Sequence, residues 1–167
     1  MTSTFVAILM GSDSDLPVMQ ATIDILKQFD INHEVRVRSA HRTPEAAKAY
    51  VQDAEDRGCK VFICAAGLAA HLAGAVAGMT TRPVIGVPVD NGPLQGHDAL
   101  LSTVMMPGGI PVATVAIGKA GAKNAGYLAA QILGVADQSI ADKVQAERKA
   151  NAIALLAKDD AMQAKLA

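Results

Sequence analysis

Residues 5–29 read FVAILMGSDSDLPVMQATIDILKQF. Phe5–Met10 is an apolar run of strand length, and the glycine, serine and aspartate residues that follow it are typical of a turn. Met19, Ile23 and Leu26 then recur at helical spacing. The stretch therefore predicts a buried strand, a short loop and an amphipathic helix, which together begin a βαβ unit.

The same alternation of apolar runs and helical segments continues along the chain, and it predicts a parallel sheet with helices on both faces. Four further strands are expected at 33–38, 61–65, 84–87 and 112–117. Further helices are expected at about 44–57, 71–79, 98–104, 120–133 and 138–166. We expect a single α/β domain over residues 1–167, with a core over 1–134 and a helical extension over 135–167.

The last predicted helix, residues 138–166, lies beyond the strands. It places Ile140, Val144, Ile153 and Leu156 on one broad side among charged residues. Such a helix needs an apolar surface to cover. Its own domain and a neighbouring subunit can each supply that surface, and the residues alone leave both open.

The composition narrows the class of protein. The net charge is -1 and no segment concentrates lysine and arginine, so the basic surface of a nucleic-acid-binding protein is not expected. No apolar run could span a bilayer and no leader pattern is visible, so we expect a cytoplasmic protein without membrane contact. Cys59 and Cys64 are close together in a strand-like stretch and should be reduced thiols.

Polar residues follow the first predicted strand. Ligands of parallel sheets bind where the carboxyl ends of strands meet helix N-termini, so these loops are the candidate site. The first loop, residues 11–15, reads GSDSD. Three interpretations remain open: its side chains cap the next helix, its hydroxyls and backbone amides bind a phosphate, or Asp13 and Asp15 chelate a divalent cation.

The second loop, residues 39–44, reads SAHRTP. Arg42 can bind a phosphate through two parallel hydrogen bonds. His41 belongs to the residue type that ordinarily gains and loses a proton near neutral pH, although a bystander role is the alternative. Thr43 is expected to cap the following helix, which begins with Pro44.

The third loop, residues 65–71, reads AAGLAAH and has almost no polar side chains. Its backbone could approach a flat ring closely and leave a small apolar pocket, large enough for carbon dioxide. Tight packing of helix against sheet explains the small residues equally well, and His71 could merely satisfy backbone groups. The usual phosphate-loop, dinucleotide and hydrolase motifs do not occur in the sequence.

Four segments in this order resemble the 5-(carboxyamino)imidazole ribonucleotide mutase family (class I PurE): residues 10–15, 39–44 and 69–72, and Leu100–Ser102 with Met106–Pro107. The resemblance implies a three-layer, flavodoxin-like subunit with about five parallel strands. It also implies a homo-octamer in which the C-terminal helix reaches across to neighbouring subunits.

The resemblance further implies a reaction of purine biosynthesis that needs neither metal nor organic cofactor. Carboxylate moves reversibly from the exocyclic nitrogen of 5-carboxyaminoimidazole ribonucleotide to ring carbon C4, with carbon dioxide as a transient intermediate. His41 stands at the family's proton carrier, and His71 lies in the loop under the imidazole ring. The expected substrate-binding residues are Gly11, Ser12, Ser14, Asp15, Ser39, Arg42, Gly67, Ala70 and Leu72.

This chain departs from the family pattern at Leu68, Ala73 and Met105, where glycine, proline and glutamine are common. Two alternatives to the mutase remain. One is a carboxylase that uses free carbon dioxide and aminoimidazole ribonucleotide on the same fold, which Arg42 in place of lysine disfavours. The other is a non-catalytic nucleotide- or flavin-binding module, which would give His41 and Arg42 no joint purpose.

Overall fold

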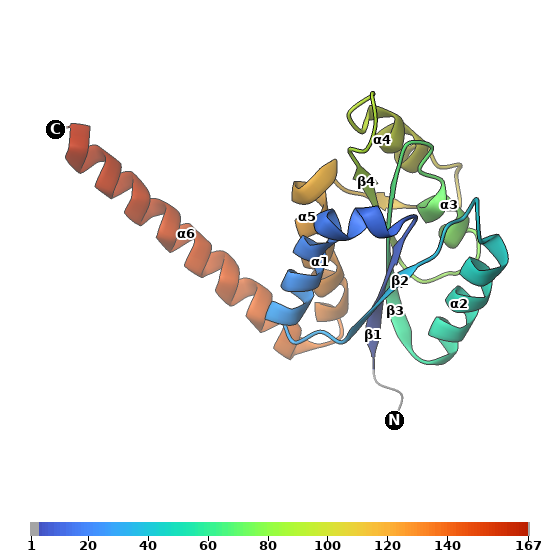
Figure 1. The fold of residues 1–167 in the computed structure, drawn as a ribbon. Coiled ribbons are helices and arrows are strands. Elements are labelled where there is room, and N and C mark those ends of the chain that lie inside the picture. Colours follow the sequence, from blue (N-terminus) through green and yellow to red (C-terminus); the bar gives the residue numbers. More distant parts are fainter. Residues whose placement is uncertain (1–3, 167) are drawn as a thin grey trace.

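A five-stranded, all-parallel sheet forms the centre of the computed structural model, which describes residues 4–166 (Figure 1). The strands are β1 (Phe5–Met10), β2 (His33–Val37), β3 (Cys59–Gly67), β4 (Val84–Val89) and β5 (Ala113–Thr114). The helices are α1 (Leu16–Gln28), α2 (Pro44–Asp56), α3 (Leu72–Ala77), α4 (His97–Val104), α5 (Gly118–Gly134) and α6 (Gln138–Leu166), with a short 3-10 turn, η1 (Asp13–Asp15). The strand order β2-β1-β3-β4-β5 is that of flavodoxin-like folds, so the predicted fold class is confirmed.

Side chains of the buried strands alternate between two cores. Val6, Ile8 and Met10 of β1 pack with α1 and α5, whereas Ala7 and Leu9 pack with α2 and α3. Figure 1 shows these two pairs of helices on opposite sides of the sheet. Because β1 pairs with β2 on one side and β3 on the other, all its residues are buried, as its unbroken apolar sequence requires.

Small residues bring the layers close together. A Cβ atom added at Gly126 of α5 would lie 2.8 Å from Ile25 Cβ of α1. A Cβ atom added at Gly86 of β4 would overlap the Thr103 side chain of α4. The low aromatic content of the chain therefore corresponds to thin, closely packed layers rather than to a poorly filled core.

The last strand is shorter than predicted. A strand was expected over 112–117, but β5 contains only Ala113 and Thr114, which pair with Ile85 and Gly86 of β4. β5 lies at the edge of the sheet and is partly exposed, and Pro111 just before it cannot donate a backbone hydrogen bond. With a partner on one side only, the apolar sequence is not held in extended pairing beyond two residues.

The first turns of α6 belong to the domain. Val144 is 7% exposed and joins the core formed by α1 and α5, with Ile140 packed against it. The Tyr127 hydroxyl of α5 donates a hydrogen bond to Glu147. This part of α6 therefore covers the chain's own surface.

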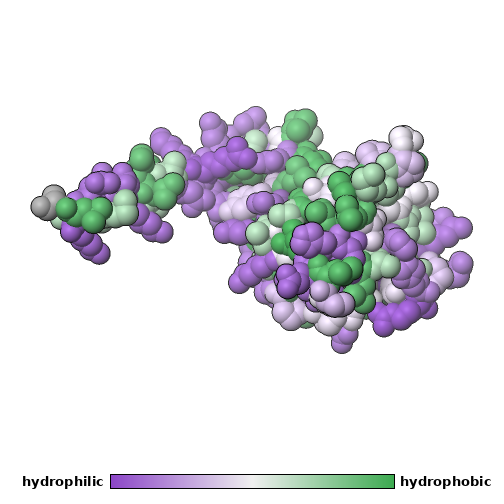
Figure 2. All heavy atoms as spheres, turned by 90° about the horizontal axis from the view of Figure 1, so that it is seen from above, coloured by the Kyte–Doolittle hydropathy of each residue, from purple (hydrophilic) through white to green (hydrophobic). Residues whose placement is uncertain are grey.

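The remainder of α6 extends away from the domain (Figures 1 and 2). Every residue from Arg148 to Leu166 is exposed, including Ile153 at 59% and Leu156 at 66%. The expectation that these four apolar residues share one side of the helix was wrong: at 3.6 residues per turn, Ile140 and Val144 lie on the side opposite Ile153 and Leu156, and only the first pair is docked. The chain's own domain covers Ile140 and Val144. A neighbouring subunit therefore remains open as the surface that covers Ile153 and Leu156.

Other expectations from composition can also be compared with the structure. Cys59 and Cys64 are buried free thiols, as predicted, and burial raises the pKa of Cys59 to about 11. None of the helices within residues 4–166 combines the length and apolar character needed to cross a membrane.

Candidate active site

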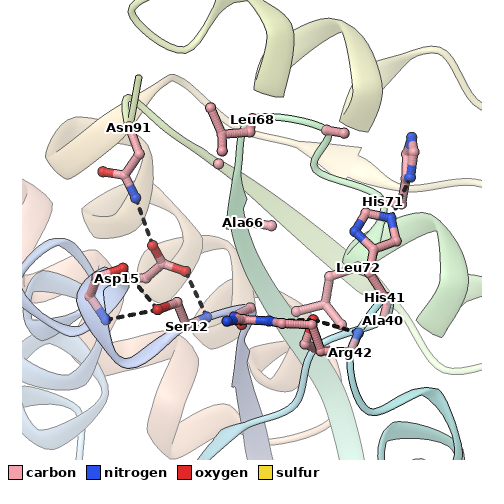
Figure 3. A pocket seen from close by; sticks show the side chains of 15 residues that line it. Ser12, Asp15, Ala40, His41, Arg42, Ala66, Leu68, His71, Leu72 and Asn91 are labelled. Carbon is pink, nitrogen blue, oxygen red and sulfur yellow. Dashed lines mark hydrogen bonds between the residues drawn. The ribbon is translucent and has the colours of Figure 1, made fainter. Parts of the chain in front are cut away.

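A pocket of about 570 Å³ opens at the carboxyl edge of the sheet, where the loops after β1, β2, β3 and β4 meet (Figure 3). All the predicted site residues line it except Ala70. Ala70 belongs to the third loop, but it is 1% exposed and does not line the pocket. The structure therefore brings together the three predicted loops, which are far apart in the sequence, and adds a fourth loop after β4.

The first loop caps the turn η1 that leads into α1. Ser12 Oγ accepts a hydrogen bond from the Ser14 amide at 3.3 Å, and Asp15 Oδ2 accepts one from the Ser12 amide at 3.2 Å. This reciprocal arrangement is a capping box, so the capping interpretation is confirmed. The hydroxyls of Ser12 and Ser14, 2.9 Å apart, still face the pocket. In residues 4–166, no group of three or more His, Cys, Asp or Glu side chains is placed to hold a metal.

Asp15 is a buried carboxylate at the wall of the pocket, with an exposed fraction of 2%. Burial raises its pKa and the charge of Asp13 adds to this, whereas hydrogen bonds from the Ser12 amide and Asn91 and the charge of Arg42 lower the pKa. Because the net shift is upward, ionisation of Asp15 disfavours the folded state once the pH rises above the ordinary carboxyl pKa. A carboxylate retained at this cost is typical of a functional site.

Arg42 connects the second loop to the first. Its Nη2 donates a hydrogen bond to the Gly11 carbonyl oxygen at 2.7 Å. Ser39 Oγ accepts hydrogen bonds from the Arg42 amide at 3.1 Å and from Nε at 3.5 Å. The guanidinium group is thereby fixed beside the first loop with further N–H groups left to bind an anion.

Thr43 occupies the position before α2 but does not cap the helix with its side chain. Its hydroxyl accepts a hydrogen bond from the Ser39 amide at 3.0 Å and donates one to the Ser39 carbonyl at 3.1 Å. Thr43 is therefore the N-cap residue by position, as predicted, but its hydroxyl is bonded within the turn over 39–43 and makes no capping bond to α2. Pro44 begins the helix as predicted.

His41 and His71 form a direct pair at one end of the pocket, opposite Asp15 and Asn91 (Figure 3). His41 Nε2 lies 2.7 Å from His71 Nδ1, and the two rings are nearly perpendicular, at 89°. One nitrogen must donate and the other accept, so a single proton lies between these two atoms. The pair can therefore exchange a proton with a ligand and with itself.

The third loop forms the apolar wall of the pocket, with Ala66, Leu68, Ala69 and Leu72 among the lining residues. Leu68 has a φ of +55°, a conformation that side chains other than glycine adopt rarely. Leucine, where the resemblance implies glycine, thus holds a backbone conformation that favours glycine, at some cost in strain. Its side chain is 52% exposed and lies against Gly92 of the next loop.

Asn91 is a pocket residue that was not predicted. It follows β4, lines the pocket, and its Nδ2 donates a hydrogen bond to Asp15 Oδ1 at 2.9 Å. The sequence could have indicated Asn91, because this residue stands just beyond the carboxyl end of a buried parallel strand. The rule that identified the first three loops applies to this fourth loop as well.

Known proteins resemble the chain over most of its length. The family model described as AIR carboxylase matches residues 5–153. The N5-carboxyaminoimidazole ribonucleotide mutase of Vibrio parahaemolyticus serotype O3:K6 (strain RIMD 2210633) is 53% identical over 152 residues, which cover 91% of this chain and 94% of the relative. The mutase of Bacillus subtilis (strain 168) is 54% identical over 144 residues, 86% of this chain and 89% of the relative. The crystal structure of Treponema denticola PurE has a TM-score of 0.83 and 34% identity, covering 94% of this chain and 97% of that one. The chain therefore belongs to the AIR carboxylase family.

Proposed function

We propose that this chain is an N5-carboxyaminoimidazole ribonucleotide mutase of purine biosynthesis. It moves a carboxylate group reversibly from the exocyclic nitrogen of its substrate to ring carbon C4. The observation that carries this function is a pocket whose lining combines a histidine pair with donors suited to a phosphate. Relatives that are more than half identical over most of the chain carry the same name.

The substrate fits the pocket with its three parts in different places. The 5'-phosphate binds at Ser12 and Arg42, where hydroxyls, backbone amides and a fixed guanidinium group converge. The ribose hydroxyls donate hydrogen bonds to the Asp15 carboxylate. The aminoimidazole ring lies between the third loop and His41, on the side of the pocket where the histidine pair stands.

The reaction needs a proton at two moments. His41 donates a proton to the carbamate nitrogen, the nitrogen–carbon bond breaks, and carbon dioxide is released beside the aminoimidazole ribonucleotide. Ring carbon C4 then forms a bond to the carbon dioxide, and His41 removes the proton from C4. The same group thus acts first as acid and then as base, and the charge of the enzyme is restored.

Two features of the pocket support this sequence of steps. Ala66, Ala69 and Leu72 form an apolar wall that binds water poorly. Carbon dioxide can therefore stay beside this wall without being displaced by water. His71 stands 2.7 Å from His41 and can accept or return a proton while His41 turns between nitrogen and carbon.

The protein acts as a homo-octamer in the cytoplasm, and residues 135–167 contribute to its assembly. Support comes from the exposed part of α6. At 3.6 residues per turn, Ile153 and Leu156 lie on one side of the helix, and Leu155, Met162 and Leu166 lie on another. A helix that is apolar on more than one side is suited to a place between neighbouring subunits.

A carboxylase that uses free carbon dioxide is the nearest alternative, because it would make the same product in the same pocket. The two functions are separated by supplying each substrate in turn at low bicarbonate. We expect rapid conversion of the carboxyamino substrate, and conversion of aminoimidazole ribonucleotide only when bicarbonate is raised. Failure to convert the carboxyamino substrate, together with conversion of aminoimidazole ribonucleotide once bicarbonate is raised, would instead identify a carboxylase.

A flavin-binding module is disfavoured by the pocket itself. No phenylalanine, tyrosine or tryptophan occurs among the residues that line it, so an isoalloxazine ring would have no aromatic surface on which to stack.

Replacing Ser12 or Arg42 with alanine should weaken substrate binding by about 1.5–3 kcal/mol, because each variant loses a hydrogen bond to a charged phosphate. Titration calorimetry with the carboxylated product measures the change. Ser139→Ala and Arg82→Ala make the same replacements at exposed positions away from the pocket and should bind as the parent does. Equal affinities in all four variants would remove Ser12 and Arg42 from the phosphate site.

A further inference from the structure

The loop after β4, residues 90–96, contributes a side chain to the pocket that the mechanism above does not use. Asn91 Nδ2 donates a hydrogen bond to Asp15 Oδ1 at 2.9 Å (Figure 3). We propose that Asn91 is a positioning residue, which holds the Asp15 carboxylate in the orientation that receives the ribose hydroxyls. The inference rests on the proposed function, since it deepens the role given there to Asp15.

Each carboxylate oxygen of Asp15 has its own donor. Oδ2 accepts a hydrogen bond from the Ser12 amide at 3.2 Å, and Oδ1 accepts the one from Asn91. Arg42 acts on Asp15 through its charge, while its Nη2 is bonded to the Gly11 carbonyl oxygen. Among residues 4–166, Asn91 is thus the side chain that donates to Asp15.

An amide is well suited to this position, because it donates a hydrogen bond without adding charge to a buried site. Burial raises the pKa of Asp15, and the bonds from the Ser12 amide and Asn91 oppose that shift. The charged groups that act on Asp15 are Asp13 on its own turn, which raises the pKa, and Arg42 from the loop after β2, which lowers it. Without Asn91, Oδ1 would be buried without a partner, and the protonated carboxyl group would be favoured.

The surrounding backbone is shaped to place Asn91. A Cβ atom added at Gly67 would lie 3.0 Å from Asn91 Cβ, so glycine lets the end of β3 approach this loop. Gly92 has a φ of +107°, which allows the chain to reverse immediately after Asn91. On the other side, a Cβ atom added at Gly118 would lie 3.2 Å from Asp90 Oδ1, so the loop also packs against the start of α5.

Replacing Asn91 with aspartate tests the proposal with almost no change of shape. The donor becomes an acceptor, and a second carboxylate is placed against Asp15. At about pH 8 we expect KM to rise about tenfold or more while kcat stays within about threefold of the parent. As the pH is lowered towards about 6, the two carboxylates share a proton and regain a hydrogen bond, so the ratio of variant KM to parent KM should fall.

Asn124→Asp is the matched control, because it makes the same change at an exposed position of α5 and should leave KM unchanged at every pH. A KM for Asn91→Asp within twofold of the parent, or a rise that is the same at every pH, would overturn the proposal. If the parent itself fails to convert the carboxyamino substrate, the proposed function has failed instead, so the two failures are distinguishable.

A double variant separates positioning from a purely structural role. Asp15→Asn combined with Asn91→Asp exchanges donor and acceptor across the same hydrogen bond. We expect it to unfold at a temperature close to that of the parent, yet to keep a raised KM, because the carboxylate now lies on the wrong side of the bond. Recovery of the parent KM would show that the position of the carboxylate is immaterial, and it would overturn the proposal.

Discussion

Replacing His41 with asparagine is expected to lower the turnover number by a factor of about 100 or more while ligand binding survives. Asparagine keeps a similar size and some hydrogen bonding, but it cannot exchange a proton near neutral pH. The reaction needs one proton delivered to nitrogen and one removed from carbon, and no other residue of the loop over 39–44 titrates in that range. Binding of the carboxylated product and steady-state turnover should be measured on the same correctly assembled protein.

His33→Asn provides the control for this experiment, since His33 begins β2 at the opposite end of the sheet from the pocket. It should retain the turnover of the parent. If His41→Asn stays within a few-fold of the parent, His41 is not the proton carrier. His71, its partner at 2.7 Å, would then be the next candidate, and His71→Asn should show the large loss instead.

Removal of residues 149–167 is expected to break the assembly while leaving the α/β domain folded. The cut falls beyond Val144, which is buried, and beyond Lys143, whose Nζ forms an ion pair with Asp30 at 2.8 Å. Light scattering should therefore report a several-fold smaller particle, and far-ultraviolet circular dichroism should still report a folded domain. Deletion of all of α6 would not separate these effects, because it also removes Val144 from the core.

The apolar residues lost in this truncation are Ile153, Leu155, Leu156, Met162 and Leu166, each at least half exposed in the single chain. Burying one such side chain stabilises the association of subunits by about 1.5–3 kcal/mol. Losing all five side chains should therefore remove a large part of the association free energy. As a control, Asp159→Ser with Asp160→Ser changes the exposed helix without removing an apolar group. A truncated protein that runs at the full size of the parent would show that the exposed part of α6 is not needed for assembly.

The sequence is informative where local pattern and tertiary environment agree. Phe5–Met10 is apolar throughout and lies between two strands, so its pattern and its surroundings demand the same structure. Residues 112–117 are similarly apolar, yet β5 has a partner on one side only and ends after two residues. The length of such a strand depends on its pairing partners in the sheet, and a single sequence does not show which strands those are.

The candidate site divides in the same way. Ser12, Asp15 and Arg42 could be found because they stand in loops that follow predicted strands. The bond between His41 and His71 could not, because it depends on how two loops 30 residues apart meet. The N-cap position of Thr43 could be predicted as well, but the bonds of its hydroxyl to the Ser39 backbone could not, because they depend on the tight turn before the helix.

Tyr127 gives the chain an optical property that needs no label. There is no tryptophan and only one other tyrosine, Tyr50, so the tyrosine emission of a Tyr50→Phe protein comes from Tyr127 alone. That ring stands at the joint between α5 and α6, where its hydroxyl donates to Glu147, and burial together with this bond raises its pKa to about 12. A carboxylate that accepts a hydrogen bond from the phenol quenches its emission, and release of the bond restores it. The fluorescence intensity of Tyr127 does not vary across neutral pH. It therefore reports in real time whether α6 is packed against its own domain.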